Sequence, residues 1–92
     1  MTDAGLERLK HLNQLQTLGI RGSRVTDEGL QHLEGLRQLR ELDLYKTRIS
    51  DTGLERLRGL VRLETLRLGE TKVTAEGMKK LQQVLPNCKI EM

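Results

Sequence analysis

The chain has 92 residues, of which 36% are hydrophobic and 32% are charged, and Tyr45 is its only aromatic residue. This length favours one domain over residues 1–92, and the near absence of aromatic side chains argues against an ordinary globular core. The net charge of +3 is scattered along the chain, and no apolar run predicts a signal peptide or a membrane span, so we expect a soluble chain compatible with the cytoplasm.

A pattern of 24 residues repeats through the whole chain after Met1. Its copies are residues 2–25, 26–49 and 50–73, with a shorter fourth copy at 74–92, and we call them the first to fourth coils. Within each copy the leucines recur first at every third position and then at every second position. A period of about 20 to 29 residues with this spacing is typical of a solenoid, in which successive coils stack.

The first half of each coil is predicted to be a short helix. In the second coil Thr26 can cap free amide groups, and Asp27 places a carboxylate at the positive end of the helix dipole. The recurring aspartates are thereby explained as helix-start residues. Gly35 and its equivalent Gly59 occupy positions where a helix commonly ends in a left-handed residue, so each helix is expected to have about two turns.

The second half of each coil is predicted to be a strand followed by a turn. Leu42 and Leu44 alternate with polar residues, so their side chains point to the same side of a strand. Thr47 follows in the turn, and Ser23 and Thr71 are its equivalents in the neighbouring coils. We expect these three side chains to form a ladder of hydroxyl groups that bonds backbone groups between adjacent coils.

Each coil therefore has a strand on one side and a helix on the other. Stacked coils pair their strands in parallel, about 4.8 Å apart, and a helix is wider than this spacing. The stack must then bend, with the strands on its inner side. The predicted fold class is α/β: a right-handed solenoid arc with a parallel sheet on the concave side and short helices on the convex side.

The "TDxGL" start of the coils, the regular leucine skeleton and the threonine in the turn resemble the leucine-rich repeat family. The similarity is greatest to bacterial repeats of this length and to the ribonuclease-inhibitor and F-box branch. The ending "LPNCKIEM" also resembles the final strand of such bacterial proteins. The resemblance implies a scaffold for protein–protein recognition through the concave face. The chain departs from the family in having few coils and no dedicated caps.

Positions that the skeleton leaves free form rows on the expected concave face. Opposite charges of neighbouring coils stand about 5 Å apart there, with Tyr45 among them, and Tyr and Arg are favoured anchors of protein interfaces. Two interpretations stay open: the charges only pair laterally on a solvated sheet, or they form a docking surface for a protein partner of unknown identity. The candidate partner-binding residues are Arg21, Glu41, Asp43, Tyr45, Thr65 and Arg67.

No combination of residues predicts catalysis or a metal site. His11 and His32 occupy different places in their coils, and neither has a Cys, Asp or second His at a zinc-like spacing. Cys88 has no histidine beside it and is expected to be a buried or edge thiol. We therefore predict a protein that is not an enzyme and has no cofactor. Nucleic-acid binding is not expected either, because aromatic stacking platforms and a concentrated basic patch are missing.

The two ends of the stack are predicted to be bare. The leucines of the first coil have no preceding coil to cover them, and in the fourth coil Asn87 stands where the other coils have leucine. Exposed leucine patches promote association, so we expect a homodimer or higher homo-oligomer formed through an uncapped end. The alternative function is therefore a homo-oligomeric structural scaffold without a ligand, truncated or engineered, that assembles through its ends. The candidate self-association residues are Leu6, Leu9, Leu18, Ile20, Ile90 and Met92.

Overall fold

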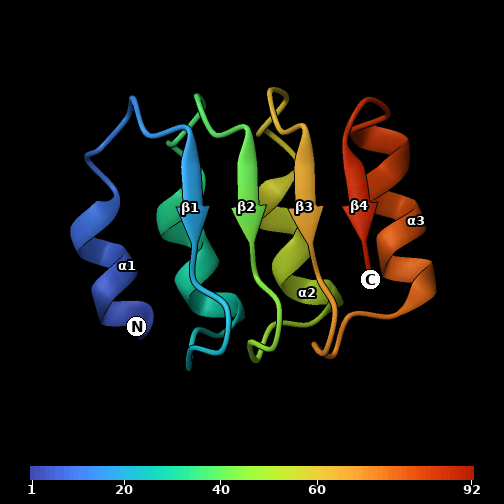
Figure 1. Cartoon of the computed structure of the whole chain (residues 1–92), viewed down its shortest axis with the longest axis horizontal. Helices are drawn as coiled ribbons and strands as arrows, with labels where there is room; N and C mark the ends of the chain where they lie inside the picture. The colour runs from blue at the N-terminus through green and yellow to red at the C-terminus, as the bar shows by residue number, and fades with distance from the viewer.

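Four short parallel strands form a single sheet, and helical residues precede each strand. In the computed structural model, which describes all 92 residues, the strands lie side by side in chain order and the helical segments form a second layer behind them (Figure 1). This arrangement confirms the predicted α/β solenoid. The elements are α1 (Asp3–Leu9), β1 (Thr17–Gly19), η1 (Asp27–Leu33), β2 (Glu41–Asp43), α2 (Asp51–Leu54), η2 (Glu55–Leu57), β3 (Thr65–Arg67), α3 (Ala75–Val84) and β4 (Lys89–Glu91).

The strands pair in the register that a coil of 24 residues predicts. Leu42 lies between Leu18 and Leu66, and Leu66 lies beside Ile90. The second and third coils bury the same positions, so the core is a ladder of leucines between the two layers. A fully buried leucine contributes about 1.5–3 kcal/mol, which makes this ladder the main source of stability. In the second coil the fully buried residues are Leu30, Leu33, Leu36, Leu39, Leu42, Leu44 and Ile49.

The helical segments change character along the chain. The segment η1 is a 3-10 helix, α2 gives way to the 3-10 helix η2 after 4 residues, and α3 has 10 residues of α-helix. A 3-10 helix is more tightly wound and narrower than an α-helix. The inner coils can therefore stack closer to the strand spacing, while α3, which has a neighbouring coil on one side only, forms a full α-helix.

The prediction that Gly35 and Gly59 end the helices in a left-handed conformation was wrong. Neither residue has a positive φ. The left-handed residues lie instead in the turn after each of the first three strands, where the chain reverses toward the next helical segment. They occupy equivalent positions of three coils, and only the first coil has glycine there: Gly22 (φ 70°), Lys46 (φ 58°) and Glu70 (φ 56°).

The variant Lys46→Gly is expected to raise the free energy of unfolding by about 0.5–1 kcal/mol. A lysine with positive φ carries a steric strain that glycine lacks, and the greater freedom of glycine in the unfolded chain offsets part of the gain. The reverse change Gly22→Lys is expected to lower the free energy of unfolding by about 1 kcal/mol. Urea unfolding measures both variants, and a Lys46→Gly protein less stable than its parent would contradict the prediction.

The turn hydroxyl groups bond their own coils, which corrects the predicted ladder between coils. Thr47 Oγ1 donates to the carbonyl oxygen of Leu44 at 2.7 Å, and Thr71 Oγ1 donates to that of Leu68 at 2.6 Å. Ser23 also bonds only within its own turn. A short hydroxyl side chain reaches a carbonyl three residues back more easily than a coil about 4.8 Å away. Each threonine thereby satisfies a carbonyl at the end of a strand.

The coils are joined instead by the aspartate at each helix start. Asp27 accepts a hydrogen bond from Ser50 N at 2.7 Å and another from the Ser50 hydroxyl at 2.5 Å. We call this contact the coil clasp. Each clasp ties the helix start of one coil to that of the next, which is more than the predicted helix-start role. The same clasp joins the other neighbouring coils, through Asp3 and Thr26 and through Asp51 and Thr74.

The glycine of the "TDxGL" sequence leaves the space that the clasp needs. A methyl group on Gly53 would overlap the Asp27 carboxylate and would lie 3.0 Å from Leu30 Cδ1. Gly29 and Gly77 face the aspartate of their preceding coils in the same way. Glycine inside a helix is less stable than alanine by about 0.5–1 kcal/mol. The close approach of the neighbouring coil explains why it stands here.

Two residues that were predicted to be uncovered in the first coil are buried. Leu6 is 0% exposed and Ile20 is 4% exposed, because α1 and the first turn face the second coil as well as the open end. The expectation of a fully bare first coil was therefore wrong for these two side chains. Of the other candidate self-association residues, Leu9, Leu18 and Ile90 are half-buried and Met92 is exposed.

Met1 helps to close the first coil. It stands at the coil position of Val25, and its carbonyl oxygen accepts a hydrogen bond from Arg24 N at 3.1 Å. Its sulfur lies against Gly5, where the inner coils have the aspartate of a clasp. Met1 thus acts as the last residue of a preceding turn and covers part of α1.

In the fourth coil Cys88, and not Asn87, takes the core position of the last leucine before the strand. Asn87 is exposed, whereas Cys88 is buried and its N–H donates to the Leu85 carbonyl at 3.1 Å. The longer helix α3 delays this core position by one residue relative to the other coils. Burial raises the pKa of the Cys88 thiol, which keeps it protonated and unreactive. The expectation of a buried thiol is confirmed.

Candidate partner-binding face

The exposed side of the sheet carries the side-chain rows that the repeat predicts, and we call this surface the concave face. The strand register forms two rows, Thr17–Glu41–Thr65–Lys89 and Gly19–Asp43–Arg67–Glu91. A third row continues beyond the strands, because main-chain hydrogen bonds of 2.8 Å extend the pairing there. Its members are Arg21, Tyr45 and Gly69.

An ion pair and a cation–π contact hold Arg21 across the first two coils. Arg21 Nε lies 2.7 Å from Asp43 Oδ2, and the guanidinium carbon lies 5.0 Å from the centroid of the Tyr45 ring. The other carboxylate oxygen, Asp43 Oδ1, accepts a hydrogen bond from Tyr45 N at 3.0 Å. These contacts fix the orientation of all three residues relative to one another.

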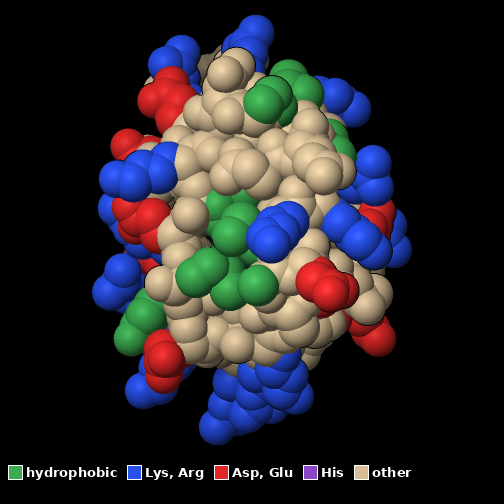
Figure 2. All heavy atoms as spheres, turned by 90° about the vertical axis from the view of Figure 1, so that its right-hand side faces the viewer, with side chains coloured by type: hydrophobic (Ala, Val, Ile, Leu, Met, Phe, Trp, Pro, Cys, Tyr) green, Lys and Arg blue, Asp and Glu red, His purple; other side chains and the backbone are tan.

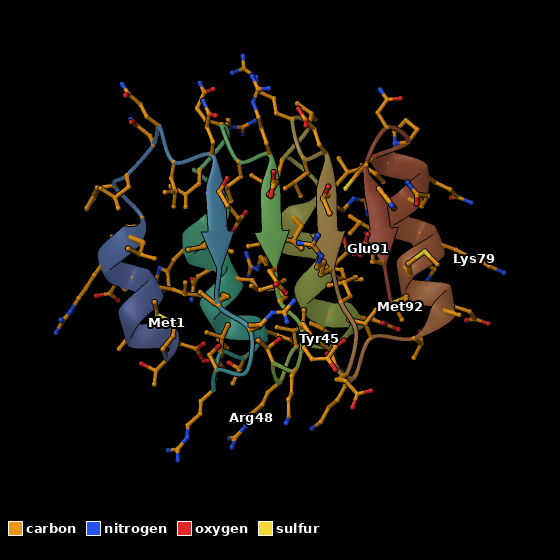
Figure 3. All side chains as sticks on the ribbon, in the orientation of Figure 1. Met1, Tyr45, Arg48, Lys79, Glu91 and Met92 are labelled. Carbon is orange, nitrogen blue, oxygen red and sulfur yellow. The ribbon has the colours of Figure 1, made fainter.

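The Tyr45 ring lies against Gly69 of the third coil. A methyl group on Gly69 would stand 3.0 Å from Tyr45 Cδ2 and 3.2 Å from the main-chain carbonyl carbon of Met92. Because Gly69 has no side chain, the ring can extend along the third row toward the end of the chain (Figure 3). Tyr45 remains 38% exposed, so it is supported by its neighbours and still open to a partner.

Arg67 and Glu91 form a second ion pair on the concave face. Arg67 Nε lies 2.9 Å from Glu91 Oε1, and Lys89 Nζ lies 3.5 Å from Glu91 Oε2. Lateral pairing is thus present, although Asp43 pairs with Arg21 and not with Arg67. Exposed ion pairs contribute only about 0–1 kcal/mol, so these charges stabilise little. The remaining candidates differ in exposure: Glu41 is exposed and Thr65 is half-buried.

Asp43 has a lowered pKa. Partial burial by itself would raise the pKa of this carboxyl, but the hydrogen bond from Tyr45 N, the hydrogen bond and charge of Arg21, and the charge of Arg67 outweigh it. The folded-state pKa therefore lies below the ordinary value of 3.8. The stability that this group adds is fully present above that ordinary value and is lost as the pH falls through the lower folded-state value.

The variant Arg21→Gln is expected to raise the pKa of Asp43 toward its ordinary value, because it removes the charge and the charged hydrogen bond. An NMR titration of the Asp43 carboxyl carbon from about pH 2 to 6 measures the shift. Arg24→Gln is the matched control, since Arg24 lies in the same coil and makes no ion pair with Asp43. An Asp43 pKa that is identical in Arg21→Gln and in the parent would contradict the ion pair.

No group of three or more His, Cys, Asp or Glu side chains is arranged to hold a metal ion. None of the helices combines the length and the apolar character that crossing a bilayer requires.

The contact between Arg21 and Tyr45, and its support by Gly69, were not anticipated from the sequence. The available signal was the third row itself, where the only aromatic residue stands between an arginine and a glycine. Identifying the rows predicted which residues share a face. It did not predict that the aromatic ring would lie along the row.

Comparisons with known proteins agree with the fold. Residues 35–57 match the family model described as "Leucine Rich repeat", and no curated protein matches the chain. A leucine-rich repeat protein of Leptospira interrogans has a similar structure, with a TM-score of 0.65 and 18% identity over 94% of this chain and 27% of that chain. The structure of the Chaetomium Mex67:Mtr2 subunits is also similar, with a TM-score of 0.68 and 16% identity over 98% of this chain and 69% of that chain. Our chain thus spans about a quarter of the length of the Leptospira protein, and identities this low show the fold alone.

Proposed function

We propose that this chain, which is a leucine-rich repeat protein by its fold and its matched repeat, binds a protein partner through the concave face of its sheet. The observation that carries the proposal is the exposed Tyr45 ring, held between Arg21 and Gly69. It is the only aromatic side chain of the protein, and it stands on the surface rather than in the core.

A preorganised tyrosine suits an interface anchor. Aromatic and arginine side chains carry a large share of the binding energy in protein interfaces. Ordering a free side chain on binding opposes association by about 0.5–1.5 kcal/mol. Here Tyr45 is restricted before a partner binds. Arg21, which is held by its ion pair with Asp43, contacts one part of the ring, and Gly69 contacts another. The partner therefore meets an aromatic surface that already has its bound orientation.

The size of the face indicates the kind of partner. Four parallel strands span only about 15 Å, which is less than a standard protein interface requires from one side. A short peptide segment or one loop of a partner fits this width. The proposed role is non-catalytic, because Asp43 and Glu91, two carboxylates of the face, are held in ion pairs with Arg21 and Arg67.

Binding to wild-type and altered protein tests the proposal. The concave-face variant Tyr45→Ala, Asp43→Ala, Arg67→Ala is expected to weaken binding of the partner at least about 30-fold, since a central anchor contributes about 2 kcal/mol or more. Val61→Ser is the matched control, because Val61 is the most exposed large hydrophobic residue and lies outside the sheet.

The partner is first recovered by proximity labelling, then purified and titrated by calorimetry against the three proteins. Equal affinity for the parent and the concave-face variant would refute the proposed face. Loss of binding in Val61→Ser alone would place the interface elsewhere. Circular dichroism must show the same folded content in all three proteins.

Self-association of a scaffold without a ligand has less support. Leu6 and Ile20 are buried and cannot contact another copy, whereas Leu9, Leu18 and Ile90 are half-buried and Met92 is exposed. With two of the six candidates excluded, we expect a monomer at micromolar concentration. Sedimentation velocity over a range of concentrations decides between the two, and a mass that rises with concentration would favour the scaffold.

A further inference from the structure

We propose that the partner segment bound by the concave face is an acidic peptide, whose carboxylates lie along the edge of the sheet where the chain turns back toward the next helical segment. The inference rests on the proposed function, because it names the chemistry of that partner. We call this edge the basic edge, and it consists of Arg24, Lys46, Arg48 and Lys72.

The basic edge is brought together by the stacking of the turns. Arg48 N donates to the carbonyl oxygen of Val25 at 3.0 Å, and Lys72 N donates to that of Ile49 at 3.0 Å. Adjacent turns therefore stand about 4.8 Å apart, and Arg24, Arg48 and Lys72 form a row about 10 Å long. The sequence spreads these cations along the chain and the stack gathers them, which changes the expectation that a basic patch is missing.

All four cations of the basic edge are exposed, and none of them forms an ion pair. Arginines elsewhere in the stack do find a partner: Arg40 Nη1 lies 3.2 Å from Glu64 Oε2, and Arg56 Nη1 lies 3.1 Å from Glu34 Oε1. The clasp aspartates that follow the turns accept hydrogen bonds from neutral N–H and hydroxyl groups instead. Figure 2 shows Lys and Arg side chains gathered at the bottom of the view, which is this edge.

Lys46 links the basic edge to the concave face and is kept in a strained backbone conformation. It directly follows Tyr45, and its φ of 58° is one that glycine adopts more easily, as Gly22 does in the first coil. Strained backbone is concentrated at functional sites. The fold alone favours glycine here, and what lysine adds is an ammonium group next to the anchor residue. Arg48 extends from the turns below Tyr45 (Figure 3).

An extended acidic peptide fits the length and the charge of the basic edge. Its residues advance about 3.3 Å each, so four of them cover the row of about 10 Å. Its carboxylates can form charge-assisted hydrogen bonds with arginine and lysine, and an apolar residue of the same peptide can pack on Tyr45. A nucleic acid matches less well, because one aromatic residue gives no row of stacking platforms.

Glu70 limits the acidic segment on the side of the third coil. It stands at the coil position of Lys46, has a φ of 56°, and is exposed without an ion pair. A carboxylate there repels an acidic peptide, so the main contacts are expected over Arg24, Lys46 and Arg48. Glu70→Gln should therefore tighten binding of the peptide about twofold to threefold.

Selection from a library of random nonapeptides displayed on phage tests the chemistry of the partner. The 92-residue chain is the bait, at a salt concentration of about 50 mM, where exposed charges are weakly screened. We expect the enriched peptides to carry at least two Asp or Glu residues close together, beside a hydrophobic residue. Enrichment of basic or uncharged peptides would overturn the inference. A selection that enriches no peptide would overturn it together with the proposed function.

An enriched acidic peptide, labelled with fluorescein, is then titrated by fluorescence anisotropy against variants. Lys46→Gly should weaken binding about threefold although it should stabilise the fold, so unfolding cannot explain the loss. The basic-edge variant Lys46→Gln, Arg48→Gln should weaken binding about tenfold. The matched control is Lys10→Gln, Lys79→Gln, because both lysines are exposed, unpaired and outside the sheet and its turns. The control should bind as the parent does.

Tyr45→Ala separates this inference from the proposed function. A loss of binding in Tyr45→Ala without a loss in the basic-edge variant would keep the concave face and overturn the basic edge. A loss in the basic-edge variant alone would support the basic edge and overturn Tyr45 as the anchor. Equal losses in the basic-edge variant and the lysine control would show attraction by net charge only, which overturns the inference. Displacement of the peptide by an equal concentration of a DNA duplex of about 20 base pairs would assign the edge to nucleic acid instead.

Discussion

Replacing Asp27 with alanine is expected to lower the free energy of unfolding by about 2–4 kcal/mol. The carboxylate receives hydrogen bonds from the Ser50 N–H and hydroxyl, at 2.7 and 2.5 Å. Removing it leaves the half-buried Ser50 N–H without a partner, and an unsatisfied donor is destabilised by the full loss of its hydration. For a domain of this length, whose total stability is about 5–14 kcal/mol, the loss is a large fraction.

Glu28→Ala is the matched control for this prediction. Glu28 is the next residue in the chain, carries the same charge, and is exposed without a side-chain hydrogen bond. Its replacement should change stability by less than about 1 kcal/mol through the helix dipole. Urea unfolding followed by circular dichroism measures both variants. Equal losses for the two substitutions would mean that charge near the helix start, and not the clasp, stabilises the joint.

The fold was predictable because three features repeat together at one period. Leu18, Leu42 and Leu66 are 24 residues apart, and a spacing of this length with a change from helix to strand periodicity fits only stacked coils. Strand register followed directly, since the side-chain alternation allows no shift of one residue. The strand register therefore confirms the predicted rows on the concave face.

Other features depend on contacts between coils, which a one-dimensional pattern does not contain. The recurring aspartate could be explained within its own helix, so the clasp to Ser50 was not predicted. The burial of Leu6 and Ile20 was missed because an end coil was treated as uncovered, although its neighbour covers one whole side. The left-handed position was assigned to the helix end, where glycine recurs. The left-handed position lies in the turn after the strand. Only the first coil has glycine there, at Gly22, whereas the next two coils have Lys46 and Glu70, which do not indicate a positive φ.

The sequence predicted which residues form the candidate site, but not which contacts they make with one another. The third row identified Arg21 and Tyr45 as neighbours, because residues 24 apart in the sequence must lie side by side in a stack. Side-chain rotamers decide whether a charged residue pairs with the preceding coil or with the following coil. Asp43 pairs with Arg21 of the first coil and not with Arg67 of the third coil. The absence of a side chain at Gly69 decides the position of the ring.

The second large effect is expected at Gly53, where alanine should lower the free energy of unfolding by about 1–3 kcal/mol. A methyl group there overlaps the Asp27 carboxylate and lies 3.0 Å from Leu30 Cδ1. The carboxylate cannot move aside without breaking its two hydrogen bonds to Ser50. The better helix propensity of alanine, worth up to about 1 kcal/mol, offsets only part of this loss.

The same substitution at the equivalent position of the first coil should have the opposite sign. A methyl group on Gly5 meets only the side chain of Met1, which is flexible and largely exposed, so Met1 can move away. Gly5→Ala should then raise the free energy of unfolding by up to about 1 kcal/mol through helix propensity. Two equal substitutions at one repeat position thus separate intrinsic propensity from the clasp. If both variants are stabilised, the approach of Asp27 to Gly53 is not the reason that glycine stands there.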